Sequence, residues 1–148
     1  MQGYSAKGAG KDMEKKIIAG AISAAAVIGV TPGYFHGNEN VIDLDSFGRL
    51  YQETADKVFA ETHMYCGAAI STCKVLYREE WGCPAGGENC VRIEADCNPS
   101  YDQERPIPEF IADWKRAFTA IIEILMTELS QKTVTVAFSD GELSYITG

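Results

Sequence analysis

The chain has 148 residues, of which 46% are hydrophobic and 23% are charged, and its formal net charge is −8. This length and composition are typical of one globular domain and exclude a largely disordered chain. The acidic balance argues against a nucleic-acid-binding protein, because contacts to phosphate groups require a basic surface.

Residues 1–12 are small, polar and rich in glycine, and they are typical of a flexible leader. Residues 17–35 then run without a charge behind Lys15 and Lys16, which is the pattern of an export signal or a signal anchor. Pro32 limits the predicted Ala-rich helix to residues 17–30, a length that also suits a helix buried in a soluble domain. Residues 13–35 are therefore predicted to be an apolar helical segment, either a signal anchor or a buried helix.

Residues 41–148 are predicted to form a single α+β domain. A long amphipathic helix is predicted from Leu44 to about Glu80, because apolar side chains recur there at spacings of three or four. This stripe comprises Leu44, Phe47, Tyr51, Ala55, Val58, Cys66, Ala69, Cys73 and Leu76.

Alternation of apolar and charged residues over 90–96 predicts a half-buried strand. A second long amphipathic helix is predicted over 107–129, with Pro108 in its first turn.

The last sixteen residues contain two alternating runs around Asp140-Gly141, which predict a hairpin with a two-residue turn. In that register Phe138 faces Leu143 and Val136 faces Tyr145. The predicted fold is thus two long amphipathic helices plus the N-terminal Ala-rich helix, packed on a small three-stranded antiparallel sheet with a C-terminal hairpin.

Candidate metal ligands lie on the first long helix, where His63, Cys66 and Cys73 could share a face. Core packing is the favoured interpretation of the two cysteines, because they fall on the apolar stripe. The spacings match neither a structural zinc site nor a dithiol redox motif. We therefore expect no cofactor, and the alternative is a transition metal such as zinc.

The five cysteines could form disulfides if the chain is exported, and because their number is odd, one thiol would remain free. Cys83 and Cys90 flank a glycine-rich loop and could close a small ring, whereas Cys97 could reach the first helix. Cys66 and Cys73 lie two helical turns apart in this prediction and cannot bond to each other. The candidates for disulfides or free thiols are Cys66, Cys73, Cys83, Cys90 and Cys97.

These patterns carry no catalytic motif, and no catalytic residue is predicted. The expected function is a non-enzymatic binding or assembly domain that is membrane-anchored through residues 15–35 or extracytoplasmic. The alternative is a cytoplasmic homo-oligomeric domain that either binds a ligand or is a thiol- or metal-binding domain. In the second case His63, Cys66 and Cys73 form the site. The expected partners are another protein or a second copy of this chain.

Overall fold

The computed structural model describes residues 13–31, 42–98 and 106–148. The elements follow the order β1 (Ile22–Gly29), α2 (Leu44–Thr62), β2 (Ala68–Val75), η1 (Glu79–Trp81), β3 (Glu88–Cys97), α3 (Ile107–Glu128), β4 (Thr133–Phe138) and β5 (Leu143–Thr147). The predicted leader, residues 1–12, lies outside the described residues, as do residues 32–41 and 99–105.

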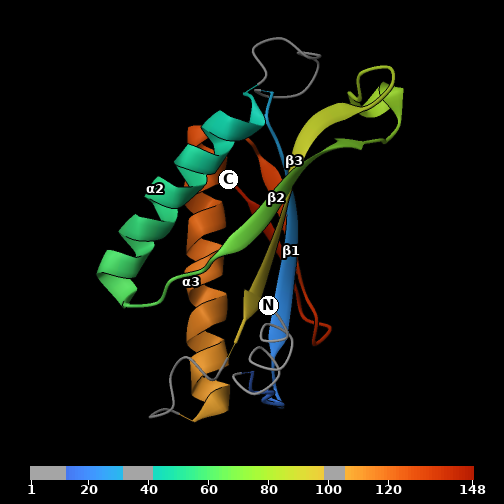
Figure 1. Cartoon of the computed structure of the whole chain (residues 1–148). Coiled ribbons are helices and arrows are strands. Elements are labelled where there is room, and N and C mark those ends of the chain that lie inside the picture. Colours follow the sequence, from blue (N-terminus) through green and yellow to red (C-terminus); the bar gives the residue numbers. More distant parts are fainter. Residues whose placement is uncertain (1–12, 32–41, 99–105) are drawn as a thin grey trace, which may run out of the picture.

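The five strands form one antiparallel sheet in the order β2-β3-β1-β4-β5. Helices α2 and α3 lie side by side on one face of this sheet (Figure 1). Strand β3 lies between β1 and β2, which is the split β-α-β arrangement of ferredoxin-like folds, and β5 extends the sheet beyond β4. The prediction of three helices on a three-stranded sheet is wrong, because the described chain has two α-helices and five strands.

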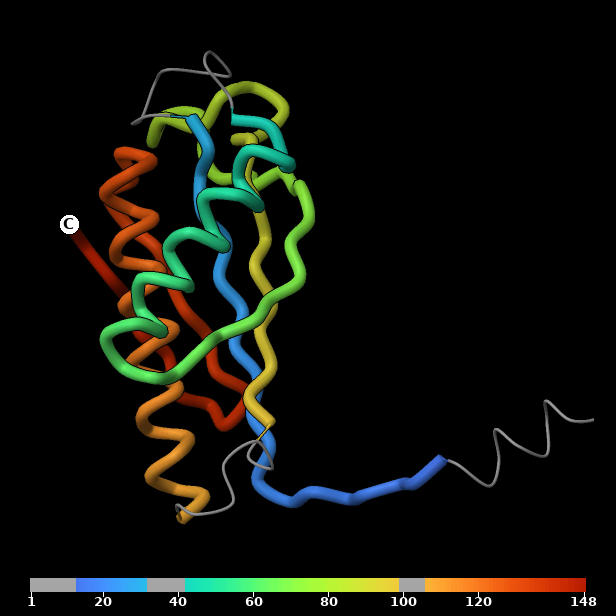
Figure 2. Tube along the Cα trace, turned by 60° about the vertical axis from the view of Figure 1, so that its left-hand side comes forward, coloured from blue at the N-terminus to red at the C-terminus, as the bar shows by residue number. Residues whose placement is uncertain are grey.

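The predicted N-terminal helix is instead a strand at the centre of the sheet. In β1 buried and half-buried side chains alternate, and Ala24, Ala26 and Ile28 face the helices. Residues 13–21 precede β1 as an arm that leaves the body, and Ile17 on it is 91% exposed (Figure 2). The predicted apolar helix is therefore wrong, because Ile22–Gly29 form a strand. No helix within the described ranges is long and apolar enough to cross a membrane.

The first predicted long helix ends about eighteen residues earlier than expected. Asp43 caps α2 by accepting a hydrogen bond from the Ser46 backbone N–H at 2.8 Å. His63 ends the helix in the left-handed conformation, with φ of 61°. The following residues then cross to the edge of the sheet and form β2.

Helix α3 occupies the residues predicted for the second helix, with its proline in the first turn. Its buried side, together with those of α2, β1, β3 and β4, makes the core. Trp114 stacks on Phe118 at 5.7 Å between ring centroids, and Phe118, Ile121 and Leu125 are fully buried.

The C-terminal hairpin is present, but its predicted register is shifted by one residue. Ala137 pairs with Leu143 and Thr135 with Tyr145, because the turn is closed between Phe138 and Glu142. Gly141 has φ of 96° in this turn, as in three-residue hairpins. Leu143 and Tyr145 consequently lie on the sheet face opposite the helices, which we call the bare face, and are 62% and 66% exposed.

Candidate active site

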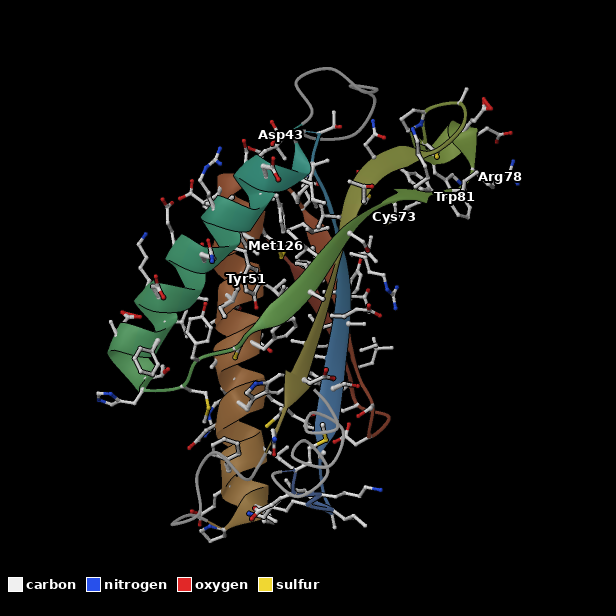
Figure 3. All side chains as sticks on the ribbon, in the orientation of Figure 1. Asp43, Tyr51, Cys73, Arg78, Trp81 and Met126 are labelled. Carbon is white, nitrogen blue, oxygen red and sulfur yellow. The ribbon has the colours of Figure 1, made fainter. Side chains whose placement is uncertain are left out.

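A hollow of about 610 Å³ opens on the bare face of the sheet. Strands β2 and β3 continue beyond the rest of the sheet and are joined by residues 76–87, and this extension carries Trp81 (Figures 1 and 3). The hollow lies between the extension and strands β1 and β4, and we call it the hairpin hollow. Its lining includes Ala25, Val27, Gly29, Val75, Tyr77, Trp81, Glu88, Cys90, Arg92, Gln131 and Lys132.

A carboxylate is fixed in the hairpin hollow by a tyrosine hydroxyl. Tyr77 follows β2, Glu88 begins β3, and the Tyr77 O–H donates to Glu88 Oε1 at 3.0 Å. Both side chains are half-buried. The second carboxylate oxygen, Oε2, is directed toward the backbone of β1 at Gly29, as the close approach of the two shows.

The side chains of Gln131 and Glu88 both approach the backbone of Gly29. The Gln131 Nε2 donates to the backbone carbonyls of Thr31 at 2.7 Å and Leu129 at 3.1 Å, which fixes the amide at the end of α3. A Cβ atom at Gly29 would lie 2.4 Å from Gln131 Oε1 and 2.5 Å from Glu88 Oε2. Only glycine therefore leaves both oxygens in place, and two acceptor oxygens converge above a strand that has no side chain there.

Aromatic and cationic side chains lie at the border of the same hollow. Trp81 is 67% exposed, and the Arg78 guanidinium lies over its ring at 5.7 Å from the centroid. Figure 3 shows Trp81 and Arg78 together on the extension of β2 and β3. Lys132 is exposed at the opposite side, on the segment that enters β4. The exposed indole of Trp81 suits a ligand with a flat ring, and the Glu88 carboxylate suits a positively charged group on that ligand.

A larger hollow of about 1160 Å³ lies at the end of α2, and its lining includes Phe59, His63 and Tyr65. Its charged groups are exposed, and Arg92 pairs with Glu94 at 3.2 Å. The hairpin hollow is the better candidate for chemistry, because it is of the usual size for a small-molecule site and holds a half-buried carboxylate with a fixed partner.

The predicted ligand set of His63, Cys66 and Cys73 is divided among three environments. His63 is the C-cap of α2, with its ring edge-on to Phe59. Cys66 is buried in the core, where its thiol contacts the Trp114 carbonyl at 3.9 Å, and Cys73 lies on β2. Among the described residues, no group of three or more His, Cys, Asp or Glu side chains is arranged to hold a metal ion.

All five cysteines are free thiols. Burial, with a smaller contribution from Cys97, raises the pKa of Cys66 to about 12, and burial raises the pKa of Cys97 to about 11. Both therefore remain protonated near neutral pH and have little nucleophilic character. Cys73 and Cys90 face each other across β2 and β3, and the buried Cys83 lies in the loop above them.

No sequence pattern identifies the residues of the hairpin hollow as functional. Tyr77 fell within the predicted helix, where an aromatic residue is ordinarily a core residue. Glu88 and Gln131 belong to no known motif, and Gly29 was part of an apolar run. Only the pairing of β1 with β3, and the position of α3, bring these four residues together.

Comparison with known proteins identifies the family. No curated protein matches the chain. A solved structure of a phage SAM lyase in complex with S-methyl-5′-thioadenosine is similar, with a TM-score of 0.59 and 14% identity over 93% of this chain and 97% of that one. A phage SAM lyase in its apo state is similar with a TM-score of 0.61 and 17% identity, over 92% of this chain and 97% of that one.

A family model described as SAM lyase matches residues 21–147. Lyases are enzymes, so the prediction of a non-enzymatic binding or assembly domain is wrong, and so is the alternative of a ligand-, thiol- or metal-binding domain. The predicted membrane-anchored or extracytoplasmic location is also contradicted, because residues 21–35 of the segment assigned to it fall within the match to this enzyme family and Ile22–Gly29 form its central strand. The chain belongs to the SAM lyase family.

Proposed function

We propose that the chain is a lyase that cleaves S-adenosylmethionine (SAM) and releases S-methyl-5′-thioadenosine from the hairpin hollow. The observation that carries this assignment is the half-buried Glu88 carboxylate, held by Tyr77 beside an exposed tryptophan. The family supplies the substrate class, and the ligand of the phage SAM lyase is the product that cleavage of SAM would give.

The charges of the hollow match those of the substrate. SAM carries a sulfonium and an ammonium group against one carboxylate, and the protein has a net charge of −8. The acidic surface therefore attracts the substrate over a distance, and the Glu88 carboxylate offers a partner for the ammonium group. The rings of Trp81 and Tyr77 offer flat faces for the adenine. The thioadenosine product has lost the ammonium group and with it this contact to Glu88, so it binds less tightly.

The reaction breaks the bond between the sulfonium sulfur and the γ-carbon of the amino-acid part. The electron pair of this bond remains on sulfur, which becomes a neutral thioether. A lyase adds no water, so the four-carbon fragment leaves as an internal ester formed by its own carboxylate or as an alkene after loss of a β-proton. In both cases Glu88 orients the fragment through its ammonium group, and correct orientation is a large part of such rate enhancements.

The test is incubation of the purified chain with SAM in water labelled with a heavy oxygen isotope, followed by mass spectrometry of the products. We expect S-methyl-5′-thioadenosine and an equimolar four-carbon product without label on the γ-carbon. The absence of S-methyl-5′-thioadenosine would contradict the proposal. A labelled γ-hydroxyl would show hydrolysis at that carbon and would contradict a lyase reaction.

A further inference from the structure

Three thiols lie close together where β2 and β3 extend beyond the rest of the sheet. None of them has a role in the proposed reaction. Cys73 on β2 and Cys90 on β3 are directly opposite each other in the antiparallel register. Cys83 lies in the intervening loop, close enough to Cys90 to influence its titration. From this geometry we infer that Cys73 and Cys90 form a redox-sensitive dithiol, which closes to a cross-strand disulfide when it meets a small-molecule disulfide.

Backbone geometry permits this bond without rearrangement. Opposite residues of an antiparallel pair have Cα atoms about 4.5 or 5.5 Å apart, and both values fall within the range of roughly 4.4–6.8 Å that a disulfide spans. Opposite residues also project from the same face of the sheet, so the two thiols point to the same side. Figure 3 shows Cys73 on β2, before the extension that carries Trp81.

The third thiol is held away from this reaction. The Cys83 Sγ donates to the backbone carbonyls of Val75 at 3.7 Å and Pro84 at 3.3 Å, and accepts from the Tyr77 N–H at 3.5 Å. Cys83 is also buried, at 6% exposure. These contacts anchor the loop on β2, and they leave Cys73 as the natural partner of Cys90.

The environments of the two thiols set the order of events. Cys73 is half-buried, and Cys90 is only 5% exposed. Burial, followed by Glu88, Cys73 and Cys83, raises the pKa of Cys90 to about 12, so Cys90 is largely protonated near neutral pH. An oxidant therefore meets Cys73 first, and Cys90 acts as the resolving thiol.

The chemistry balances with a low-molecular-weight disulfide as the oxidant. The Cys73 thiolate attacks one sulfur of that disulfide, forms a mixed disulfide and releases one thiolate. The released thiolate takes the proton of Cys90, whose sulfur then attacks Cys73 Sγ, forms the Cys73–Cys90 bond and releases the second thiolate. The two cysteines lose two protons and two electrons, and the oxidant is reduced to two thiols. The disulfide links β2 covalently to β3, close in the sequence to Tyr77 and Glu88.

The test treats the full chain with glutathione disulfide, blocks the remaining thiols by alkylation and maps tryptic peptides by mass spectrometry. We expect the peptide of residues 58–74 to be crosslinked to that of residues 79–92. Because each peptide holds two cysteines, fragmentation of the crosslinked pair must place the bond at Cys73 and Cys90. A bond between Cys83 and Cys90, or five alkylated thiols, would overturn the inference.

Two variants sharpen the test. Cys90→Ser is expected to stop at a glutathione adduct on Cys73, whereas Cys83→Ser is the matched control and is expected to close the bond. Closure that persists in Cys90→Ser would overturn the assignment. The wild-type peptide map needs no variant, so it decides the question even if a substitution impairs folding. Formation of the bond is independent of the proposed reaction on SAM, so failure of one leaves the other standing.

Discussion

At the scale of single residues, the candidate site depends on the absence of a Cβ atom at Gly29, a residue of the central strand. A methyl group there would collide with Gln131 Oε1 and Glu88 Oε2, both of which are the ends of flexible side chains. The collision is thus relieved by moving the site, while the core is preserved. This separates an effect on catalysis from an effect on stability.

Gly29→Ala is therefore expected to lower kcat/KM for SAM at least about 10-fold, because small displacements of positioning groups are costly. Its melting temperature should stay close to that of the wild type, since the backbone at Gly29 lies outside the left-handed region. Steady-state kinetics and thermal unfolding measure the two effects.

Gly48→Ala is the matched control. A Cβ atom there would lie 3.5 Å from Ile70 Cδ1, an ordinary contact, and Gly48 is within α2. We expect unchanged activity and about 0.5–1 kcal/mol of added stability. Unchanged activity in Gly29→Ala would contradict the placement of the site in the hairpin hollow.

At the scale of elements, the sequence predicted some structure correctly and misjudged other parts for identifiable reasons. The second helix could be predicted, because its apolar residues recur at helical spacing along its whole length and form its buried side. The first apolar stripe ran on past the true helix end, because Cys66, Ala69 and Cys73 keep a helical spacing by coincidence. The sequence signals for a strand were the β-branched residues Ile70, Thr72 and Val75.

Strand β1 was missed for a different physical reason. It is the central strand, with β3 and β4 on its two sides and two helices over one face, so small apolar residues fit both faces. Such a run of alanines shows no alternation in the sequence and resembles an apolar helix. The candidate site could not be predicted, because it depends on this strand.

The start of α2 offers a test of the capping interaction. The Ser46 backbone N–H, followed by the Ser46 side chain, lowers the pKa of Asp43. A lowered pKa in the folded state means that this contribution to stability is present above the unfolded value and is lost as pH falls through the folded value. The relevant window therefore lies below about pH 4.

Asp43→Ala is expected to lower the melting temperature at neutral pH, and the difference from the wild type should shrink as the pH falls below this value. Asp43→Asn keeps an acceptor oxygen at every pH, so its advantage over alanine should persist in acid. Thermal unfolding as a function of pH measures both differences. A wild-type advantage that grows in acid would contradict the role of the carboxylate.

At the scale of the whole molecule, one face of the sheet is covered by helices and the other is bare. Leu143, Tyr145 and Trp81 are more than half exposed on the bare side, and β2 and β5 end the sheet without a further strand among the described residues. Apolar side chains gathered on one side commonly mark a contact surface. We propose that copies of this chain associate through the bare face.

Light scattering after size exclusion should then give a mass that is a multiple of 16.1 kDa. Leu143→Glu is expected to shift the distribution toward single chains, because it places a charge in the contact. A mass of one chain for the wild type at micromolar concentration would contradict self-association.

The central claim is that Glu88 in the hairpin hollow acts on SAM, and the most direct measurement is kcat/KM for SAM of Glu88→Gln beside Glu80→Gln. Both variants remove one carboxylate from the same extension of the sheet, but the Glu80 side chain is 77% exposed and pairs with Arg78 at the surface. We predict a loss of at least about 100-fold for Glu88→Gln and a change below about 3-fold for Glu80→Gln. Equal kcat/KM values for the two variants would contradict the account.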